Sequence, residues 1–347
     1  MRKVKVGYQL DFRNPPGSPR SFRELYRESL AQVQAAEQLG FNSIWLTEHH
    51  FTDDGYLPAL MPAAAAIAAR TTRVTIGTFV VLAPFFHPLK LAEDAAFVDV
   101  VSGGRLRLGI GLGYRAEEFA GFGVPRAQRL GRTLETIEIL KLAWTGERFS
   151  FDGKYFKFRD VRVLPRPVSQ PYPELLWGAG AAKSIRRAAE LNLSFACVGG
   201  RREIGIYLEA LKAAGKDPAR YSIVNSRVVY VADSEEQAWR DTRDALMYQA
   251  ELYGIWLSAA AGTTDQSKVL IRPDPDRLRR TSVLGTASEV AAKLEEIFAS
   301  TPMTELIVVM QLPGLDPAKA RLSLDRFGTE VLPHLNYTGG CQTRESS

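Results

Sequence analysis

The sequence predicts one closed (β/α)8 TIM barrel with insertions at the face where the carboxyl ends of the strands meet. Three observations favour this fold. Short β-branched or apolar runs alternate with amphipathic stretches of helical length. Eight such runs can be counted, each interleaved with a helical stretch. No shift in composition marks a second domain, so we expect residues 1–337 to form a single barrel domain and residues 338–347 a disordered tail.

The first half of the chain supplies four of these strands. The helix predicted over 22–39 has the clearest ends, because Ser21 and Glu24 can form a capping box and Gly40 can terminate it. A hairpin around Asp152 and Gly153, a pair typical of tight turns, is expected to project from the barrel. The predicted elements are strand 4–8, helix 22–39, strand 43–47, helix 62–70, strand 74–81, helix 88–101, strand 106–111, helix 129–144 and the hairpin strands 149–151 and 155–158.

The second half continues the alternation until one segment interrupts it. Residues 254–284 are rich in Gly, Thr and Pro and carry a basic cluster at Arg277, Arg279 and Arg280, so we expect a long inserted loop that acts as a mobile lid. The remaining elements are strand 174–177, helix 182–191, strand 194–197, helix 203–214, strand 222–231, helix 234–253, helix 287–298, strand 305–311 and helix 317–331.

Composition excludes several classes of protein. The chain has 347 residues, of which 46% are hydrophobic and 24% charged, as in a soluble globular protein. It lacks the run of about 20 apolar residues that a membrane-spanning helix needs, and its first residues lack the pattern of a secretory signal, so we expect a cytoplasmic protein. The net charge of +5 is not gathered in one block, which disfavours nucleic acid as a partner and favours an anionic small molecule. Two distant cysteines, Cys197 and Cys341, support neither a disulfide framework nor a thiolate zinc site.

Catalytic side chains of such a barrel lie at the carboxyl ends of its strands. The second strand ends in Glu48, His49 and His50, and an imidazole there can transfer a proton near neutral pH, because its ordinary pKa is about 6.5. A purely structural histidine is the alternative. A metal site would need these side chains together with Asp53. Neighbouring side chains of an extended chain point to opposite faces, so we expect no metal.

The fourth strand runs into a glycine-rich segment, Leu108–Tyr114. Its glycines would let a flat or phosphorylated ligand approach the backbone closely, although tight packing at a strand end explains them too. Tyr114 stands where the dinucleotide-binding fingerprint requires its third glycine, so the segment does not match that fingerprint.

The fifth strand leads through Trp177–Ser184 directly into a helix. Free N–H groups, the positive end of the helix dipole and the charge of Lys183 would together suit a phosphate. A plain helix start with flexible glycines is the alternative. The next strand ends in Cys197–Gly200, without the acidic residue that binds the ribose of a nicotinamide dinucleotide, so that cofactor is the weaker candidate.

Several segments together resemble the bacterial luciferase-like family of flavin-dependent monooxygenases, whose members are (β/α)8 barrels. The likeness extends from about residue 4 to residue 335, and the order and spacing of the segments make a chance match improbable. The segments are Trp45–Thr52, Gly77–Thr78 through His87–Pro88, Glu93–Asp94, Ser102–Arg105, Gly113–Arg115, Glu117–Phe119, Phe122–Gly123, Pro165–Pro167 and Leu284–Thr286.

The resemblance implies roles for individual residues. His49 is expected to be the general base, and Glu48 to orient or polarise it. Phe79 and Val80 are expected to form a non-proline cis peptide beneath the flavin ring, and Gly111–Arg115 to lie along the ring and ribityl chain. The expected cofactor contacts are Phe79, Val80, Gly111, Tyr114, Trp177, Gly178, Gly180, Ala181, Ala182, Lys183 and Ser184.

The sequence departs from luciferase itself at four positions. Leu112 stands at the position of the phosphate-binding arginine and Gly111 at that of the reactive cysteine. Gly180 and Lys183 stand at the positions of the serine and threonine that bind the phosphate. These departures argue against light emission, and we expect Lys183 and backbone amides to bind the phosphate instead.

The function that the resemblance implies is a two-component monooxygenase. FMN reduced by a separate NAD(P)H:flavin reductase would bind at the barrel mouth, react with O2 to give a flavin hydroperoxide and transfer one oxygen atom to a small organic substrate. A deazaflavin-dependent dehydrogenase on the same fold and a non-catalytic flavin-binding protein are the alternatives. A homodimer is expected from the family and from the alanine-rich stretch Met61–Ala69.

Overall fold

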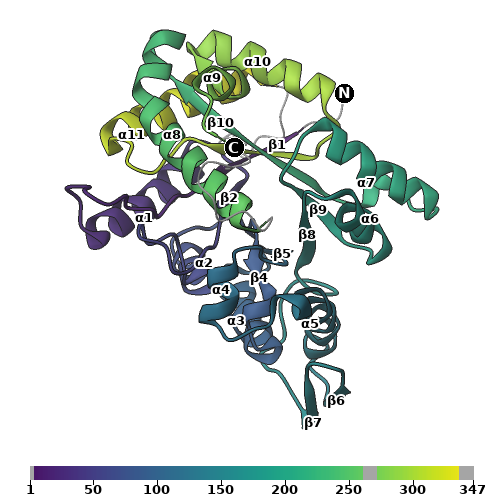
Figure 1. Cartoon of the computed structure of the whole chain (residues 1–347). Coiled ribbons are helices and arrows are strands. Elements are labelled where there is room, and N and C mark those ends of the chain that lie inside the picture. The colour runs from purple at the N-terminus through teal and green to yellow at the C-terminus, as the bar shows by residue number, and fades with distance from the viewer. Residues whose placement is uncertain (1–3, 261–271, 336–347) are drawn as a thin grey trace, which may run out of the picture.

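A computed structural model describes residues 4–260 and 272–335 of the chain (Figure 1). Eight parallel strands follow one another around a closed ring in the order β1, β2, β3, β5, β8, β9, β10 and β12, and β12 pairs with β1. The predicted (β/α)8 barrel is therefore confirmed. The eight strands are β1 (Lys5–Gln9), β2 (Ser43–Leu46), β3 (Thr75–Thr78), β5 (Leu106–Gly111), β8 (Glu174–Ala179), β9 (Ser194–Cys197), β10 (Ile223–Val231) and β12 (Glu305–Val309).

Helices surround the ring, and the antiparallel hairpin of β6 (Phe149–Asp152) and β7 (Lys157–Val161) projects from it (Figure 1). The capping box of Ser21 and Glu24 is present at the first helix, as predicted. The helices are α1 (Phe22–Gln38), α2 (Leu60–Ala68), α3 (Pro88–Ser102), α4 (Ala116–Gly121), α5 (Arg129–Ala143), α6 (Ala182–Glu190), α7 (Arg201–Ala213), α8 (Glu235–Ala260), α9 (Pro275–Thr281), α10 (Ala287–Ser300) and α11 (Pro317–Arg326).

Two parts of the structure differ from the sequence prediction. The strand predicted over 74–81 is split into β3 and β4 (Val81–Leu82), and the peptide bond between Phe79 and Val80, which lies between them, is cis. The prediction of a loop over 254–284 is wrong where the chain is described. The helix α8 continues to Ala260, α9 follows, and β11 (Val283–Gly285) pairs with β10. Residues 261–271 of the predicted lid and the predicted tail lie outside the described residues.

The start of α9 has a clear physical cause. The side chain of Asp274 accepts hydrogen bonds from the backbone N–H groups of Asp276 and Arg277, and Pro275 occupies the first helical position. Both residues favour a helix start, and the richness of the segment in Gly and Thr concealed that signal.

The interior of the barrel is built around the indole of Trp45. Glycines on the two flanking strands make room for it: a Cβ added at Gly7 would lie 2.7 Å from the indole, and one at Gly77 would lie 2.3 Å from it. An apolar layer surrounds the ring and consists of Leu176, Ala196, Val224 and Ile307, with Phe79 and Val80 packed against it.

A buried ionic network lies beside this indole. Arg107 on β5 pairs with Glu305 on β12 and with Glu174 on β8, and its guanidinium lies 5.1 Å from the ring of Trp45. The indole N–H donates to Glu305 over 2.7 Å. Burial acts to lower the pKa of Arg107, but the two carboxylates outweigh it and raise that pKa. Since β5 and β12 stand opposite each other in the ring of strands, the pair braces the barrel across its interior.

Arg107→Met is expected to lower the free energy of unfolding by about 3–5 kcal/mol, because the carboxylate of Glu305 then stays buried without its cationic partner. Urea unfolding measures the change. The matched control is Arg148→Met, which removes an exposed ion pair with Asp160 and should cost less than about 1 kcal/mol. Equal losses in the two variants would contradict the bracing role of Arg107.

Candidate active site

The two halves of the predicted site lie on the same face of the barrel. His49 follows the carboxyl end of β2, and Gly180 follows the carboxyl end of β8. Because all eight strands run parallel in one closed ring, their carboxyl ends meet at one face. His49 and the predicted phosphate loop therefore lie at the same face of the barrel.

The imidazole of His49 is held by a carboxylate that the sequence analysis missed. Its Nδ1 lies 2.8 Å from Oε1 of Glu118, in the short helix α4. Its Nε2 lies 3.4 Å from the hydroxyl of Tyr114. Both His49 and Glu118 are buried, with exposed fractions of 6% and 0%. The ring is thus fixed at one nitrogen and turned toward the glycine-rich segment at the other.

The prediction that Glu48 orients His49 is wrong. Glu48 instead places Oε1 at 3.1 Å from Nε2 of His50, and its Oε2 accepts the backbone N–H of Leu82 at 2.6 Å. The cause is the alternation of side chains at the end of β2, which sends residues 48 and 50 to one side and residue 49 to the other. Two separate histidine–carboxylate pairs result, His50 with Glu48 and His49 with Glu118.

The surroundings of the two carboxylates separate their pKa values. Burial raises the pKa of Glu48 above its usual range, in spite of the hydrogen bonds from His50 and Leu82. Burial also acts to raise the pKa of Glu118, but the contacts with His49, the backbone N–H of His50 and the charge of Arg115 outweigh it and lower the pKa. Glu118 is therefore the ionised carboxylate at neutral pH, and Glu48 is the one closer to protonation.

Aromatic rings cover His49. The ring of Tyr56 lies 4.8 Å from the imidazole centroid, that of Trp256 5.0 Å and that of Tyr253 6.1 Å. The guanidinium of Arg115 lies 4.4 Å from the ring of Trp256. Tyr253 and Trp256 belong to α8, and Trp256 falls in the segment predicted to be a loop. The spacing of these two aromatics, three residues apart, was the available signal for a continuing helix.

Val80 fills the space beside the glycines of the fourth and fifth predicted strands. A Cβ added at Gly111 would lie 2.3 Å from Val80, one at Gly178 2.7 Å and one at Gly109 3.2 Å. The cis peptide before Val80, implied by the resemblance, is present. These close approaches of Val80 support the tight-packing interpretation of the glycines, and the cofactor contact of Gly111 stays a prediction. Phe79, next to Val80, packs edge-on against the indole of Trp45 in the barrel interior.

The predicted phosphate loop is open and uncapped. Ala181 precedes α6 and gives its first turn no side-chain hydrogen bond. Gly180, Ala181 and Lys183 are exposed, Ala182 is half-buried, and a Cβ added at Gly180 would meet no atom within 4 Å. Backbone N–H groups and the Lys183 ammonium are donors that fit a phosphate.

Trp177 does not face this open turn. Its indole is fully buried in the main core, and its N–H donates over 3.0 Å to the hydroxyl of Ser184. Its indole therefore supports the first turn of α6 from the core side, and a cofactor contact of Trp177 stays a prediction. The Ser184 oxygen accepts this bond.

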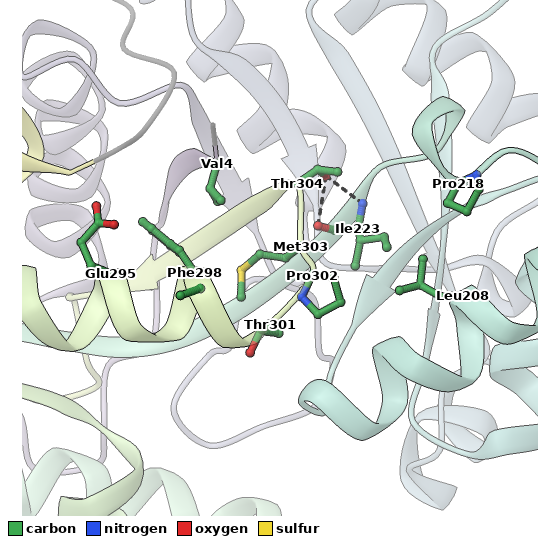
Figure 2. A pocket seen from close by; sticks show the side chains of 11 residues that line it. Val4, Leu208, Pro218, Ile223, Glu295, Phe298, Thr301, Pro302, Met303 and Thr304 are labelled. Carbon is green, nitrogen blue, oxygen red and sulfur yellow. Dashed lines mark hydrogen bonds between the residues drawn. The ribbon is translucent and has the colours of Figure 1, made fainter. Parts of the chain in front are cut away.

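Figure 2 shows a cavity of about 360 Å3 at the other end of the barrel. It lies where β10 and β12 begin. Among the residues that line it, the hydroxyl of Thr304 accepts a hydrogen bond from the backbone N–H of Ile223 at 2.8 Å. This cavity is distant from the strand ends that carry His49. Within residues 4–260 and 272–335, no cluster of His, Cys, Asp or Glu suits a metal ion, and no helix is long and apolar enough to cross a membrane.

Comparison with known proteins decides the family. Residues 4–305 match the family described as luciferase-like monooxygenase. The chain belongs to this family. The resemblance inferred from the sequence is thereby confirmed, and members of the luciferase-like family are oxidoreductases.

Three relatives illustrate its range. The oxygenase component of flavin-dependent trigonelline monooxygenase from Acinetobacter baylyi is 27% identical, over 90% of each chain. An F420-dependent glucose-6-phosphate dehydrogenase from Amycolatopsis mediterranei is 30% identical, over 90% of this chain and 96% of its own. The crystal structure of the monooxygenase RslO1 from Streptomyces bottropensis superposes with a TM-score of 0.82 at 28% identity, covering 95% of this chain and 99% of that one.

Glu118→Gln is expected to lower the free energy of unfolding by roughly 2 kcal/mol at pH 7, because it removes the charged acceptor of His49 and of the His50 N–H. The folded-state pKa of Glu118 is below its ordinary value of 4.5, so this stabilisation is present above pH 4.5 and is lost as the pH falls through the lowered pKa. Urea unfolding at pH 7, 5 and about 3 should show the gap between wild type and variant closing.

The control for this prediction is Glu117→Gln, which removes the neighbouring exposed carboxylate of the same helix. It should leave stability unchanged at each pH. A gap between wild type and Glu118→Gln that stays constant over the whole range would contradict the assignment of Glu118 as the ionised partner.

Proposed function

We propose that this protein is the oxygenase component of a two-component flavin-dependent monooxygenase. It would bind FMN reduced by a separate NAD(P)H:flavin reductase and use O2 to oxygenate a small organic substrate. One observation carries the proposal: the carboxylate-bound imidazole of His49 and the uncapped, lysine-bearing turn of α6 lie at one barrel face. The similarity to the oxygenase component from Acinetobacter baylyi supports it.

The residues of this face fit the parts of the cofactor. The amides of residues 180–182, the ammonium of Lys183 and the hydroxyl of Ser184 would bind the phosphate, and the backbone at Val80 and Gly111 would support the ring. Tyr114 stays a predicted cofactor contact, and its hydroxyl lies 3.4 Å from Nε2 of His49. Reduced FMN, when bound, supplies the reaction with oxygen that amino-acid side chains cannot perform.

His49 would hold or move a proton at Nε2. Its Nδ1 is committed to the ionised Glu118, which fixes the orientation of the ring. Trp256 and Tyr253 exclude water from this proton, and the His50–Glu48 pair holds the chain at Leu82. Glu48 would therefore act on the backbone and not directly on His49.

A second candidate is an F420-dependent dehydrogenase, which would transfer hydride without oxygen. The 30% identity to the dehydrogenase from Amycolatopsis mediterranei favours it, and the same open turn would suit the phosphate of a deazaflavin. A flavin-binding protein without catalysis is a weaker candidate, because it gives the His49–Glu118 pair no role. The homodimer and the cytoplasmic location stay predictions. Exposed apolar side chains on α3, among them Phe97 and Val101, support the homodimer.

Anaerobic titration with reduced FMN, followed by a pulse of oxygen, tests the proposal. We expect saturable binding and slower reoxidation of the flavin than in free solution, because the site shields the ring from water. Reduced F420 is the comparison ligand. Binding of F420 alone, with its reduction by an organic substrate under anaerobic conditions, would contradict the monooxygenase and support the dehydrogenase.

His49→Ala is expected to slow product formation by about 10²- to 10⁴-fold without abolishing FMN binding, as for the loss of a general acid or base. Fluorescence quenching measures the binding and an oxygen electrode the turnover. Lys183→Met should do the reverse, weakening FMN binding with little effect on the rate at saturating FMN. Unchanged turnover of His49→Ala would remove this imidazole from the chemistry.

A further inference from the structure

A cavity of about 690 Å3 lies outside the site described above. Its walls are the segment Val198–Gly200 at the start of α7, Arg227 on β10 and one side of α9. None of the residues that surround His49 lines it. In Figure 1, α9 lies close to α8 and α10, and α7 lies beside α6 and β9. The cavity therefore occupies a separate position on the protein.

Arg227 forms the wall of this cavity on the barrel side, and its orientation is fixed. Its Nη1 donates over 2.7 Å to the side chain of Asn225 and over 2.7 Å to the carbonyl of Ser226. Asn225 is itself held, because its amide donates to the carbonyls of Cys197 and Gly199 at 3.1 and 2.8 Å. The rest of the guanidinium approaches Gly200, where Nη2 would lie 3.6 Å from an added Cβ.

This guanidinium has no anionic partner in the described part of the chain. It is half-buried and forms no ion pair with a carboxylate of residues 4–260 or 272–335, and burial lowers its pKa. Partial burial of a cation without a counter-charge costs free energy, and an anion placed in the cavity would offset that cost. Arginine is also the side chain best suited to bind the two oxygens of a phosphate or carboxylate.

Three further arginines, Arg272, Arg277 and Arg280, carry the same sign of charge into the cavity. Arg277 and Arg280 line it from α9 and form no ion pair with any described residue. The carboxylate of Asp274 also lines the cavity, but it accepts the backbone N–H groups that cap α9. The helix is held in place by Arg279, which pairs with Glu235 on α8 over 2.9 Å. Positive charge therefore exceeds negative charge among these groups.

We propose that Arg227, Arg277 and Arg280 bind an oxyanion, a phosphate or carboxylate group of a small molecule, in this cavity. The site is distinct from the phosphate loop at the start of α6, although the two are neighbours: β8 pairs with β9, so the loops after Ala179 and Cys197 begin side by side. The ligand is either a free anionic metabolite or the anionic group of a molecule that also reaches the barrel mouth.

Binding of inorganic phosphate to the full-length protein without flavin, measured by isothermal titration calorimetry, tests the proposal. We expect saturable binding that weakens at least tenfold in Arg227→Met. Because this variant loses a half-buried side chain, the double variant Arg277→Met/Arg280→Met, whose changes are at exposed positions, should show the same loss. The matched control is Arg243→Met, an exposed arginine of α8 outside the cavity.

The outcomes separate this proposal from the proposed function. Equal phosphate binding by wild type, Arg227→Met and the double variant would overturn it, because the anion would then bind only elsewhere, as in the loop at α6. Displacement of phosphate by succinate would extend the ligand class to carboxylates, and displacement by phosphate esters alone would restrict it to phosphates. Failure of the protein to bind FMN would overturn the monooxygenase but would not affect these measurements.

Discussion

The ion pair of Arg107 with Glu305 is the interaction on which the geometry of this barrel depends. It joins β5 and β12 across the interior, and the indole of Trp45 lies against both partners. Glycines on neighbouring strands admit that indole, and the apolar layer that supports Phe79 and Val80 packs around it. The Arg107–Glu305 ion pair at the centre of the barrel therefore holds the packing that supports Phe79 and Val80 in the candidate active site.

The alternation of apolar runs and amphipathic stretches was sufficient to predict the ring of strands, because burial on both faces leaves a strong pattern in a parallel barrel. Two strands, Leu106–Gly111 and Ser194–Cys197, have the predicted bounds. The loop expected over 254–284 is wrong, because the helix start at Asp274 and Pro275 outweighs the Gly- and Thr-rich composition of the segment. Local signals for capping were decisive there.

The sequence predicts the position of those site residues that directly follow the end of a strand. His49 and Gly180–Lys183 could be placed on one face for that reason. The partner of His49 could not, since Glu118 lies 69 residues further along the chain and no spacing rule links them. The histidine partner of Glu48 and the direction of the Trp177 indole could not be predicted for a related reason: whether a side chain faces the mouth, the interior or the helices depends on local alternation and packing.

The helix α8 borders both sites described here. Tyr253 and Trp256 cover the imidazole of His49, and Ala250, less than one turn earlier, lines the arginine-rich cavity. A helix of 26 residues is a nearly rigid rod about 39 Å long. A displacement of this rod that admits a ring to the imidazole therefore also reshapes the wall of the cavity. A ligand bound at either site would then change the affinity of the other site for its own ligand. The movement of α8 would couple them, without direct contact between the two ligands.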